Sequence, residues 1–435
     1  MTSSAPTTRH RRLFAAALVA FSLLPEAIAA RDEKNGDRVA FLPGQPRRPP
    51  VSQFAGYVTV NESNGRALFY WFFEAQASPA QKPLLLWLNG GPGCSSVGYG
   101  AASELGPLLV NGNGTGLELN KFSWNREANL LFLESPVGVG FSYTNTTSDL
   151  DKLNDRFVAE DTYNFLVNWF NKFPLYKSND FYISGESYAG HYVPQLAEVV
   201  YEGNKHLESN QQINLKGFIV GNAITDEYYD EKGLVDFAWS HSVISDQIYE
   251  HVKNVCDFRL SYFTNECAYA MNLVYTQYHK IDIFNVYAPK CNADESAHSS
   301  SSVSTVETNA KKKFNRLRMY SGYDPCYSSH IEDYLNRMDV QKSLHANVSG
   351  WIKDRRWSIC SGDVDGRVPV IGSRYWVEAL GLPVKSQWQP WYLKDQVAGR
   401  FVEYEGLTMA TVRGAGHDVP QDKPAEAFVI IMNKR

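Results

Sequence analysis

Hydrophobic positions along the chain fall into two alternating kinds of segment. Short runs that are apolar almost throughout predict strands of a sheet with both faces covered. These runs span residues 56–60, 67–73, 84–88, 129–133, 180–183, 218–220 and 408–412. Between them, residues 157–173 and 193–200 place apolar side chains three and four positions apart, which predicts amphipathic helices. Strands that alternate with helices predict an α/β fold with a central sheet flanked by helices.

The alternation stops between residues 225 and 320, where the chain is rich in aromatic residues. We interpret this segment as an insertion that divides the core into a first part, 30–224, and a second part, 321–435. Within it, a serine-rich run at 299–304 and the lysines at 311–313 predict an exposed loop that is open to cleavage.

The N-terminus has the pattern of a secretory signal peptide over residues 1–29. Three arginines precede an apolar run over residues 13–24, and Ala27-Ile28-Ala29 offers a cleavage site with small residues. A membrane anchor is the alternative, but this apolar run is too short to span a bilayer. The sequence therefore predicts a protein that is secreted or vacuolar and that has no membrane attachment after cleavage.

Charge and cysteine content narrow the possible partners. The formal net charge is −5, and the basic cluster is confined to the N-terminus, so we expect no nucleic-acid partner. An even set of cysteines without a Cys-x-x-Cys motif, in an oxidising compartment, favours disulfides over metal ligands or free thiols. They are Cys94, Cys256, Cys267, Cys291, Cys326 and Cys360. Sequons predict N-glycosylation at Asn61, Asn113, Asn145 and Asn347.

A candidate nucleophile, Ser187, lies in the run Gly185-Glu186-Ser187-Tyr188-Ala189-Gly190, between a predicted strand and a predicted helix. A nucleophile elbow needs small residues two positions to either side of the serine, because the backbone is strained and the hydroxyl must stand clear. Ala189 departs mildly from the glycine of the strict pattern. An ordinary glycine turn is the alternative interpretation.

A glycine cluster directly after the apolar run 84–88 supports the first interpretation. Acyl transfer needs backbone N–H donors aimed at the developing oxyanion, and glycine lets the chain approach closely. The cluster Asn89-Gly90-Gly91-Pro92-Gly93 would provide one donor from Gly91, and Tyr188 would provide the other. A phosphate-binding loop is the competing interpretation, but the cluster lacks the Gly-Lys-Ser/Thr ending of such loops.

A base and an acid follow the serine in the chain order of a hydrolase triad. His417 lies in a glycine-rich loop after the predicted strand 408–412, where it would take the proton of Ser187. Asp363 and Asp365 are both candidates for the acid that orients the histidine. The ten histidines show no His-Glu-x-x-His or comparable spacing, so the sequence predicts neither a metal nor an organic cofactor.

Taken together, these segments resemble the signatures of the serine carboxypeptidase family, especially its plant-type members, from residue 37 to residue 424. The resemblance rests on the runs 87–96, 185–190 and 414–417. It implies an α/β-hydrolase fold with a mainly helical cap inserted over 225–320. It also implies a carboxypeptidase that releases C-terminal amino acids at acidic pH through an acyl-enzyme on Ser187, with Asp365 rather than Asp363 as the triad acid.

The resemblance also implies how a substrate is recognised. Asn89, Gly90, Glu104 and Glu186 would bind the terminal carboxylate of a peptide or protein. A carboxyl group donates a hydrogen bond to a carboxylate only while protonated, so we expect binding to weaken as the pH rises.

Further implications of the resemblance concern cross-links and assembly. Disulfides would join Cys94 to Cys360, Cys256 to Cys267, and Cys291 to Cys326. The serine-rich linker resembles the one excised in two-chain members, which are often homodimers.

The chain departs from the family pattern just before Asp365. In the family, a helix and a strand normally separate a cysteine such as Cys360 from a Ser-Gly-Asp such as 361–363, whereas here the two are adjacent. We therefore expect an internal deletion that removes one core strand and with it the support that aims Asp365. Such a chain would fold poorly or have low activity.

Other functions compete with the carboxypeptidase. The same triad can pass an acyl group from a sugar ester to an alcohol, but relatives of that kind tend to carry aspartate where this chain has Glu186. The remaining alternative is an inactive, splice-type variant, owing to the deletion between Cys360 and Ser361.

Overall fold

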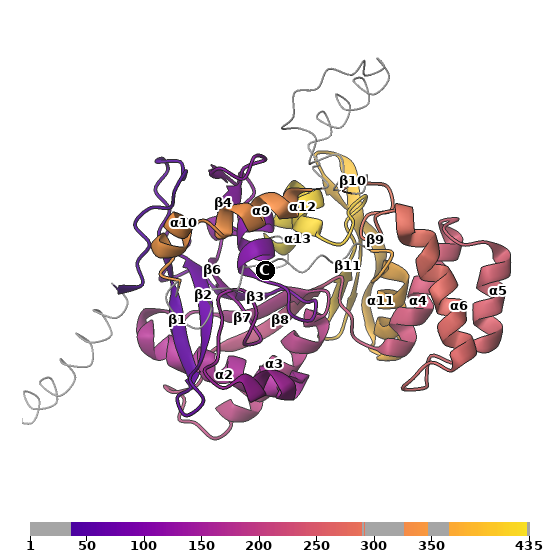
Figure 1. The fold of residues 1–435 in the computed structure, drawn as a ribbon, viewed down its shortest axis with the longest axis horizontal. Coiled ribbons are helices and arrows are strands. Elements are labelled where there is room, and N and C mark those ends of the chain that lie inside the picture. The colour runs from indigo at the N-terminus through magenta and orange to yellow at the C-terminus, as the bar shows by residue number, and fades with distance from the viewer. Residues whose placement is uncertain (1–35, 289–290, 292–325, 347–364, 433–435) are drawn as a thin grey trace, which may run out of the picture.

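The apolar runs near the N-terminus pair into one mixed sheet with the strand order β1-β2-β6-β3-β7-β8 (Figure 1). The computed structural model describes residues 36–288, 291, 326–346 and 365–432. Its central strands are β1 (Gln53–Asn61), β2 (Arg66–Phe73), β6 (Asn129–Leu133), β3 (Leu84–Leu88), β7 (Phe181–Glu186) and β8 (Leu215–Gly221). The last four run parallel to one another, so their carboxyl ends lie at one edge of the sheet and bring the following loops together.

Both faces of this sheet are apolar because successive side chains point to opposite sides of a strand. In β2, Phe69, Trp71 and Phe73 pack in one hydrophobic cluster, and Leu68 and Tyr70 belong to the other. β3 and β6 divide their side chains in the same way. A sheet buried on both sides therefore explains the nearly continuous apolar runs, and the predicted α/β architecture is confirmed.

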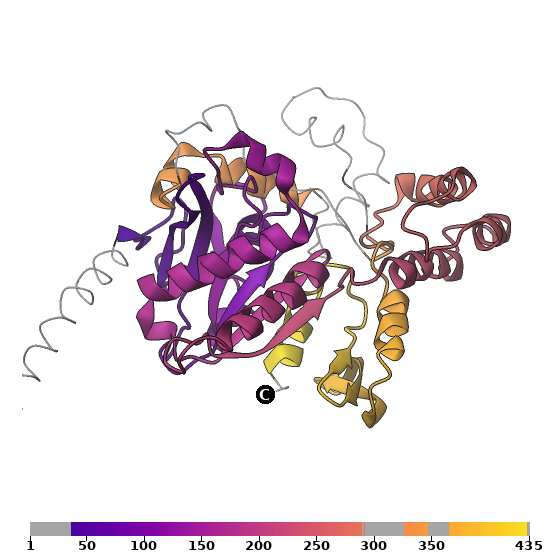
Figure 2. The same ribbon diagram turned by 90° about the horizontal axis from the view of Figure 1, so that it is seen from below.

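Helices cover the two faces as separate layers (Figures 1 and 2). One layer consists of α2 (Asp155–Lys172) and α3 (Ala189–Asn204), whose apolar faces pack in the second cluster. The opposite layer contains η1 (Val97–Glu104), α9 (Tyr327–Leu335), α10 (Met338–Ser343) and α13 (Pro424–Met432). The Asn154 side chain caps α2 by accepting a hydrogen bond from the N–H of Phe157.

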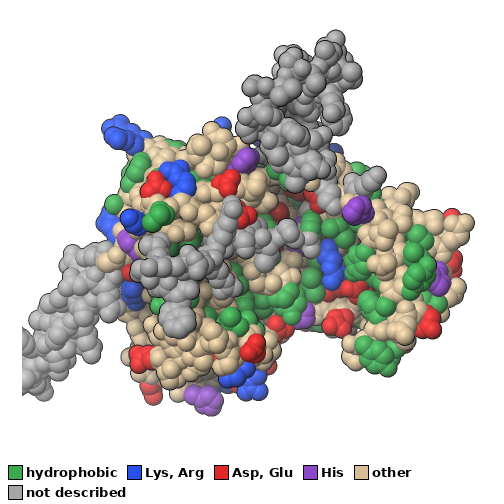
Figure 3. Space-filling view, viewed as in Figure 1, with side chains coloured by type: hydrophobic (Ala, Val, Ile, Leu, Met, Phe, Trp, Pro, Cys, Tyr) green, Lys and Arg blue, Asp and Glu red, His purple; other side chains and the backbone are tan. Residues whose placement is uncertain are grey.

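The inserted segment is helical where the structure describes it. It contains α4 (Glu227–Ser240), α5 (Asp246–Val255) and α6 (Asn265–Gln277), which pack around a hydrophobic core of their own. A disulfide between Cys256 and Cys267 closes the loop between α5 and α6. Figure 3 shows hydrophobic side chains on the surface of these helices, and the α5–α6 loop exposes Leu260, Tyr262 and Phe263.

The C-terminal region forms a smaller sheet of its own. The strands β9 (Val384–Leu393), β10 (Gln396–Tyr404) and β11 (Thr408–Ala410) are antiparallel and follow the order β11-β10-β9. The predicted strand at 408–412 is thus present as β11, but it pairs with β10 and not with the central sheet. Nearby, α11 (Val370–Ala379) packs on α4, where Gly233 and Gly372 approach so closely that a Cβ on Gly233 would lie 2.5 Å from the Cα of Gly372.

Short elements complete the described part of the chain. They are β4 (Leu108–Val110), β5 (Leu117–Leu119), η2 (Trp124–Arg126), η3 (Thr147–Lys152), η4 (Pro174–Tyr176), η5 (Tyr278–Lys280) and α12 (Val419–Asp422). Among the described residues, no helix is both long enough and apolar enough to cross a bilayer.

Several sequence-based expectations fall outside the described residues. They are the signal peptide, the serine-rich loop, Asn347, Asp363, and the Cys360–Ser361 junction. Within the described part, β8 is the last strand at its edge of the central sheet, and the missing strand before Asp365 stays a prediction. A second disulfide joins Cys291 to Cys326, one of the pairs that the resemblance implies.

A buried ion-pair network ties the sheet to its helical layer. Arg66, at the start of β2, donates from Nε and a terminal nitrogen to the two oxygens of Asp161 in α2, at 2.8 and 2.9 Å. Its other terminal nitrogen lies 3.1 Å from the carboxylate of Asp149. All three side chains are buried, so the network holds only while the guanidinium balances both carboxylates.

We expect Arg66→Ala to lower the free energy of unfolding by about 3–5 kcal/mol, because it leaves two carboxylates buried without their cation. The matched control is Arg156→Ala in α2, whose partner Glu160 is also exposed, and which should cost about 0–1 kcal/mol. Urea unfolding of both variants measures the difference. Equal losses in the two variants would contradict a stabilising role for the buried network.

Candidate active site

The turn between β7 and α3 carries Ser187 in a backbone conformation that few L residues adopt. Its φ is +61°, and its N–H donates to the carbonyl of Gly221 at 3.1 Å. Flanking residues are small because there is no room: a Cβ on Gly185 would lie 2.3 Å from the carbonyl oxygen of Leu88, and one on Gly190 would lie 2.2 Å from that of Ile224. This is the strained strand-to-helix turn that the sequence predicts for a nucleophile.

The glycine loop after β3 lies directly against this turn. A Cβ on Gly90 would be 2.3 Å from the backbone nitrogen of Tyr188 and 2.8 Å from the Cβ of Ser187. Gly91 has a φ of +106° and lines the same cavity as Ser187. Tyr188 begins the first turn of α3, where backbone N–H groups are without intrahelical partners. The arrangement suits an oxyanion hole formed by the N–H groups of Gly91 and Tyr188.

His417 lines the same cavity as Ser187. Its ring is hydrogen-bonded to Asp365. The ring Nδ1 lies 2.9 Å from Oδ1 of Asp365, and a carboxylate acceptor makes Nδ1 the protonated nitrogen. The Nε2 atom is then the one that can accept a proton from a serine hydroxyl. His417 is 3% exposed, whereas the Asp365 side chain retains 20% exposure. Burial raises the pKa of Asp365, and the hydrogen bond to His417 opposes that rise.

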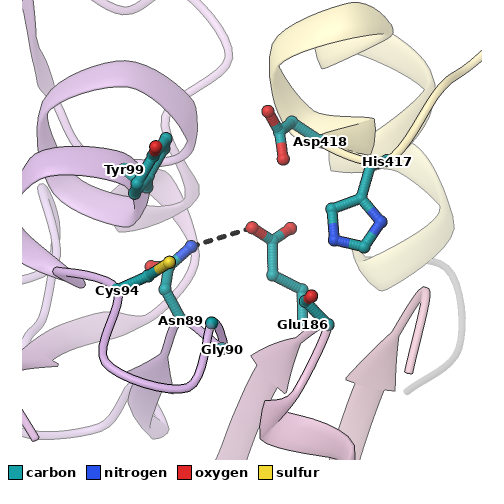
Figure 4. Close-up of a pocket in the computed structure, with 9 residues that line it drawn as sticks. Asn89, Gly90, Cys94, Tyr99, Glu186, His417 and Asp418 are labelled. Atoms are coloured by element: carbon teal, nitrogen blue, oxygen red, sulfur yellow. Dashed lines mark hydrogen bonds between the residues drawn. The ribbon is translucent and has the colours of Figure 1, made fainter. Parts of the chain in front are cut away.

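Two carboxyl groups share the amide of Asn89, and Figure 4 shows the bond to one of them, Glu186. The Asn89 Nδ2 donates to Oε1 of Glu186 at 2.8 Å and to Oε1 of Glu104 at 3.1 Å. The Asn89 Oδ1 accepts from the indole N–H of Trp87 at 2.8 Å and from the N–H of Gly100 at 3.1 Å, which fixes the orientation of the amide. The other oxygen of Glu104 is buried and has no hydrogen-bond partner among the described residues.

These carboxyl groups retain their protons to higher pH than an exposed glutamic acid does. Burial raises the pKa of Glu104 well above its ordinary value, and repulsion from Asp418 adds to the rise. Burial also raises the pKa of Glu186, with further contributions from Glu104 and Asp418. The pKa of Asp418 is itself raised to about 6, mainly by burial. The site therefore gathers acidic groups whose neutral forms are favoured.

The structure brings most of the predicted site residues to one cavity. Its lining is Asn89, Gly90, Gly91, Cys94, Tyr99, Glu186, Ser187, His417 and Asp418. Sequence reasoning missed Tyr99, Asp418 and Asn222, whose amide bonds to Asp365. Asp418 directly follows the predicted histidine, and Asn222 follows a glycine at the end of a strand, a pair that often marks a turn. These two sequence positions, beside a predicted site residue and in a turn, are the features that could have identified Asp418 and Asn222.

The remaining predictions for individual residues concern metal ligands and glycosylated asparagines. No cluster of three or more metal-ligating side chains occurs within the described ranges 36–288, 326–346 and 365–432. The glycosylation candidates Asn113 and Asn145 are exposed, and Asn61 is half-buried at the end of β1.

With this geometry established, similarity to known proteins assigns the family. Residues 43–361 and 352–434 match the family described as "Serine carboxypeptidase". The chain belongs to the serine carboxypeptidase family. Serine carboxypeptidase-like 26 of Oryza sativa subsp. japonica is 60% identical over 433 residues, covering 92% of this chain and 90% of that protein. Serine carboxypeptidase-like 33 of Arabidopsis thaliana is 54% identical over 436 residues, covering 92% and 91%.

A solved carboxypeptidase structure has the same fold. Kex1ΔP, a prohormone-processing carboxypeptidase from Saccharomyces cerevisiae, superposes with a TM-score of 0.70 at 22% identity, covering 92% of this chain and 95% of that chain. At this identity the likeness concerns the fold alone.

The family match overlaps itself, and the rice alignment contains gaps in this chain. The matched stretches overlap over residues 352–361, the region of the Cys360–Ser361 junction. The rice alignment runs over 433 positions but covers only 92% of the 435-residue chain, so some residues of that protein have no counterpart here.

Gly90→Ala tests the close approach of the glycine loop to the nucleophile turn. Because the added Cβ would displace Tyr188 or Ser187, we expect the rate of Ser187 labelling by a fluorophosphonate to fall by about 10²-fold. Gly112→Ala is the control, since a Cβ at Gly112 meets nothing within 4 Å. Labelling of Gly90→Ala at the control rate would show that the approach is not needed.

Proposed function

We propose that this chain is a serine carboxypeptidase that releases the C-terminal amino acid of a peptide or protein at acidic pH. The observation that carries the proposal is the buried set of Asn89, Glu104 and Glu186 beside Ser187. A protonated carboxyl and an amide are neutral donors, and a peptide's terminal carboxylate is the acceptor that such donors would bind. An endopeptidase has no use for such a group next to its nucleophile.

The proposed reaction proceeds through two acyl transfers. Ser187 Oγ attacks the carbonyl of the last peptide bond while His417 Nε2 takes the hydroxyl proton. The oxyanion accepts hydrogen bonds from the N–H groups of Gly91 and Tyr188. His417 then gives the proton to the departing amino group, the C–N bond breaks, and an ester on Ser187 remains. Water gives a proton to His417 as it attacks this ester. The ester C–O bond then breaks, the shortened peptide leaves, and His417 returns the proton to Ser187 Oγ.

The raised pKa values of Glu104 and Glu186 determine the direction of the pH dependence. Below these values both carboxyls are neutral and donate to the substrate carboxylate. As the pH rises through them, the donors become anions and repel the same group. We therefore propose that substrate binding is strong in acid and is lost toward neutral pH, in keeping with a protein that is secreted or vacuolar.

Two alternatives rest on the same site. An acyltransferase would use the triad with a sugar-ester donor, but Glu186 lengthens the side chain where such relatives tend to carry aspartate. An inactive variant would follow from the deletion at Cys360–Ser361, which the overlap of the family matches at 352–361 supports. Both alternatives are outcomes of the activity test.

Steady-state kinetics with a blocked dipeptide should give a KM that rises from acidic to neutral pH, because protonated Glu104 and Glu186 are lost as donors. In Glu186→Gln the amide donates at every pH, so we expect a weaker rise. The control substrate is the same dipeptide with an amidated C-terminus, whose KM should not follow these carboxyls. A parental KM that is constant with pH, or an unchanged rise in Glu186→Gln, would contradict the binding role.

Activity itself is tested with the secreted chain and Ser187→Ala, using a fluorophosphonate, a blocked dipeptide and a glucose ester. We expect stoichiometric labelling and dipeptide hydrolysis, both abolished by Ser187→Ala. Turnover of the glucose ester alone would identify an acyltransferase. Absence of labelling in a folded chain would identify the inactive variant.

A further inference from the structure

The acid of the triad is held in an unusual way within the described part of the chain. Asp365 is not preceded by a described strand, and the central sheet ends at β8. A catalytic acid must nevertheless be fixed to a fraction of an ångström for its histidine to be aimed correctly. Within the described residues, the contacts of Asp365 come from Val368 close by in the chain and from other elements.

One of these elements is the end of the inserted helical segment. The carbonyl oxygen of Phe284 accepts from the N–H of Asp365 at 2.7 Å and from the N–H of His417 at 3.2 Å. The neighbouring carbonyl of Ile283 accepts from the N–H of Gly366 at 2.6 Å. A single carbonyl thus sets the spacing between the backbones of the acid and the base, but it does not orient the carboxylate.

Besides His417, two groups bond the Asp365 carboxylate: the backbone of Val368 and the side chain of Asn222, which follows β8. Its Nδ2 donates to Oδ2 of Asp365, the oxygen that does not bond to His417. The same Nδ2 lies 3.3 Å from the carbonyl oxygen of Gly416, the residue before His417. Asn222 has a φ of +42°, a conformation in which asparagine is tolerated better than most side chains. Its amide therefore reaches both loops from the edge of the central sheet.

We propose that Asn222 is a positioning residue, which aims Asp365 at His417 by bonding the outer carboxylate oxygen and the loop that carries the histidine. This inference rests on the proposed triad. It assigns to a side chain of β8's end the support that a preceding strand would otherwise give to the acid. The effect of Asn222 on catalysis is exerted through Asp365 and not through contact with substrate.

The Asn222 amide also affects the electrostatics of the Asp365–His417 pair, because acidic groups surround this pair. Glu186 and Asp418 both interact with Asp365, and Asp282 and Asp422 interact with Asp418. These carboxyl neighbours disfavour negative charge on Asp365, whereas a backbone hydrogen bond from Val368 and the Asn222 amide stabilise it. Without this donor, the carboxylate would favour protonated His417 more strongly, and the histidine would stay charged to higher pH.

Asn222→Gly is the informative variant, because glycine accepts the positive φ and only the amide is lost. Lys394→Gly is the matched control: Lys394 is exposed in the β9–β10 turn, and its φ is +48°. For Asn222→Gly we expect kcat to fall by about 10–10²-fold with KM nearly unchanged. We also expect the acidic limb of the kcat–pH profile to move upward, and to move further in Asn222→Asp.

Two results would overturn the proposal. These are a kcat for Asn222→Gly equal to that of Lys394→Gly, or a loss of kcat without any shift of the acidic limb. The fluorophosphonate result on the parent chain separates this failure from failure of the proposed function, since an unlabelled parent contradicts the triad itself.

A second measurement tests the proposal even if turnover is absent. The Nδ1 proton of His417, hydrogen-bonded to Asp365, should give a low-field proton NMR signal in the parent, assigned by its absence in His417→Gln. We expect this signal to disappear in Asn222→Gly and to persist in Lys394→Gly. An unchanged signal in Asn222→Gly, or no signal in the parent, would contradict the positioning role.

Discussion

The left-handed backbone at Ser187 is the constraint on which the rest of the site depends. A φ of +61° between β7 and α3 turns the chain sharply enough to present the hydroxyl at the carboxyl edge of the sheet. Such a conformation costs free energy and persists only where neighbouring contacts enforce it. Here the neighbours are Gly90 and Gly221, from the loop after β3 and the end of β8. The parallel order β3-β7-β8 makes this meeting possible.

The second constraint is the burial of acidic groups. Glu186 and Asp418 line the cavity, Glu104 shares the Asn89 amide with Glu186, and burial disfavours charge on each of the three. In such a site the neutral carboxyl groups are favoured and their ionised forms are destabilised. In the buried Arg66 network a guanidinium lies between two carboxylates, and its hydrogen bonds oppose the rise that burial causes in the pKa of Asp161. The two sets of buried carboxyl groups therefore differ in whether a cation lies beside them.

The inserted helical segment contributes a backbone contact to the site. Its last described turn supplies the carbonyl of Phe284 to the backbones of both Asp365 and His417. Residues from the sheet edge, from the insertion and from the C-terminal loop thus converge on one acid–base pair.

The amino-acid sequence by itself determined the elements and the chemistry. Nearly continuous apolar runs predicted the strands of the central sheet, and fixed spacing identified the serine turn, the glycine loop and the histidine, because each depends on residues close together in the chain. Only the tertiary structure decided which distant groups meet. It placed β11 in a separate sheet and Asp418 in the cavity, and it put the Asn222 amide on Asp365. Contacts between segments far apart in the chain have no local signature, so they exist only once the chain is packed.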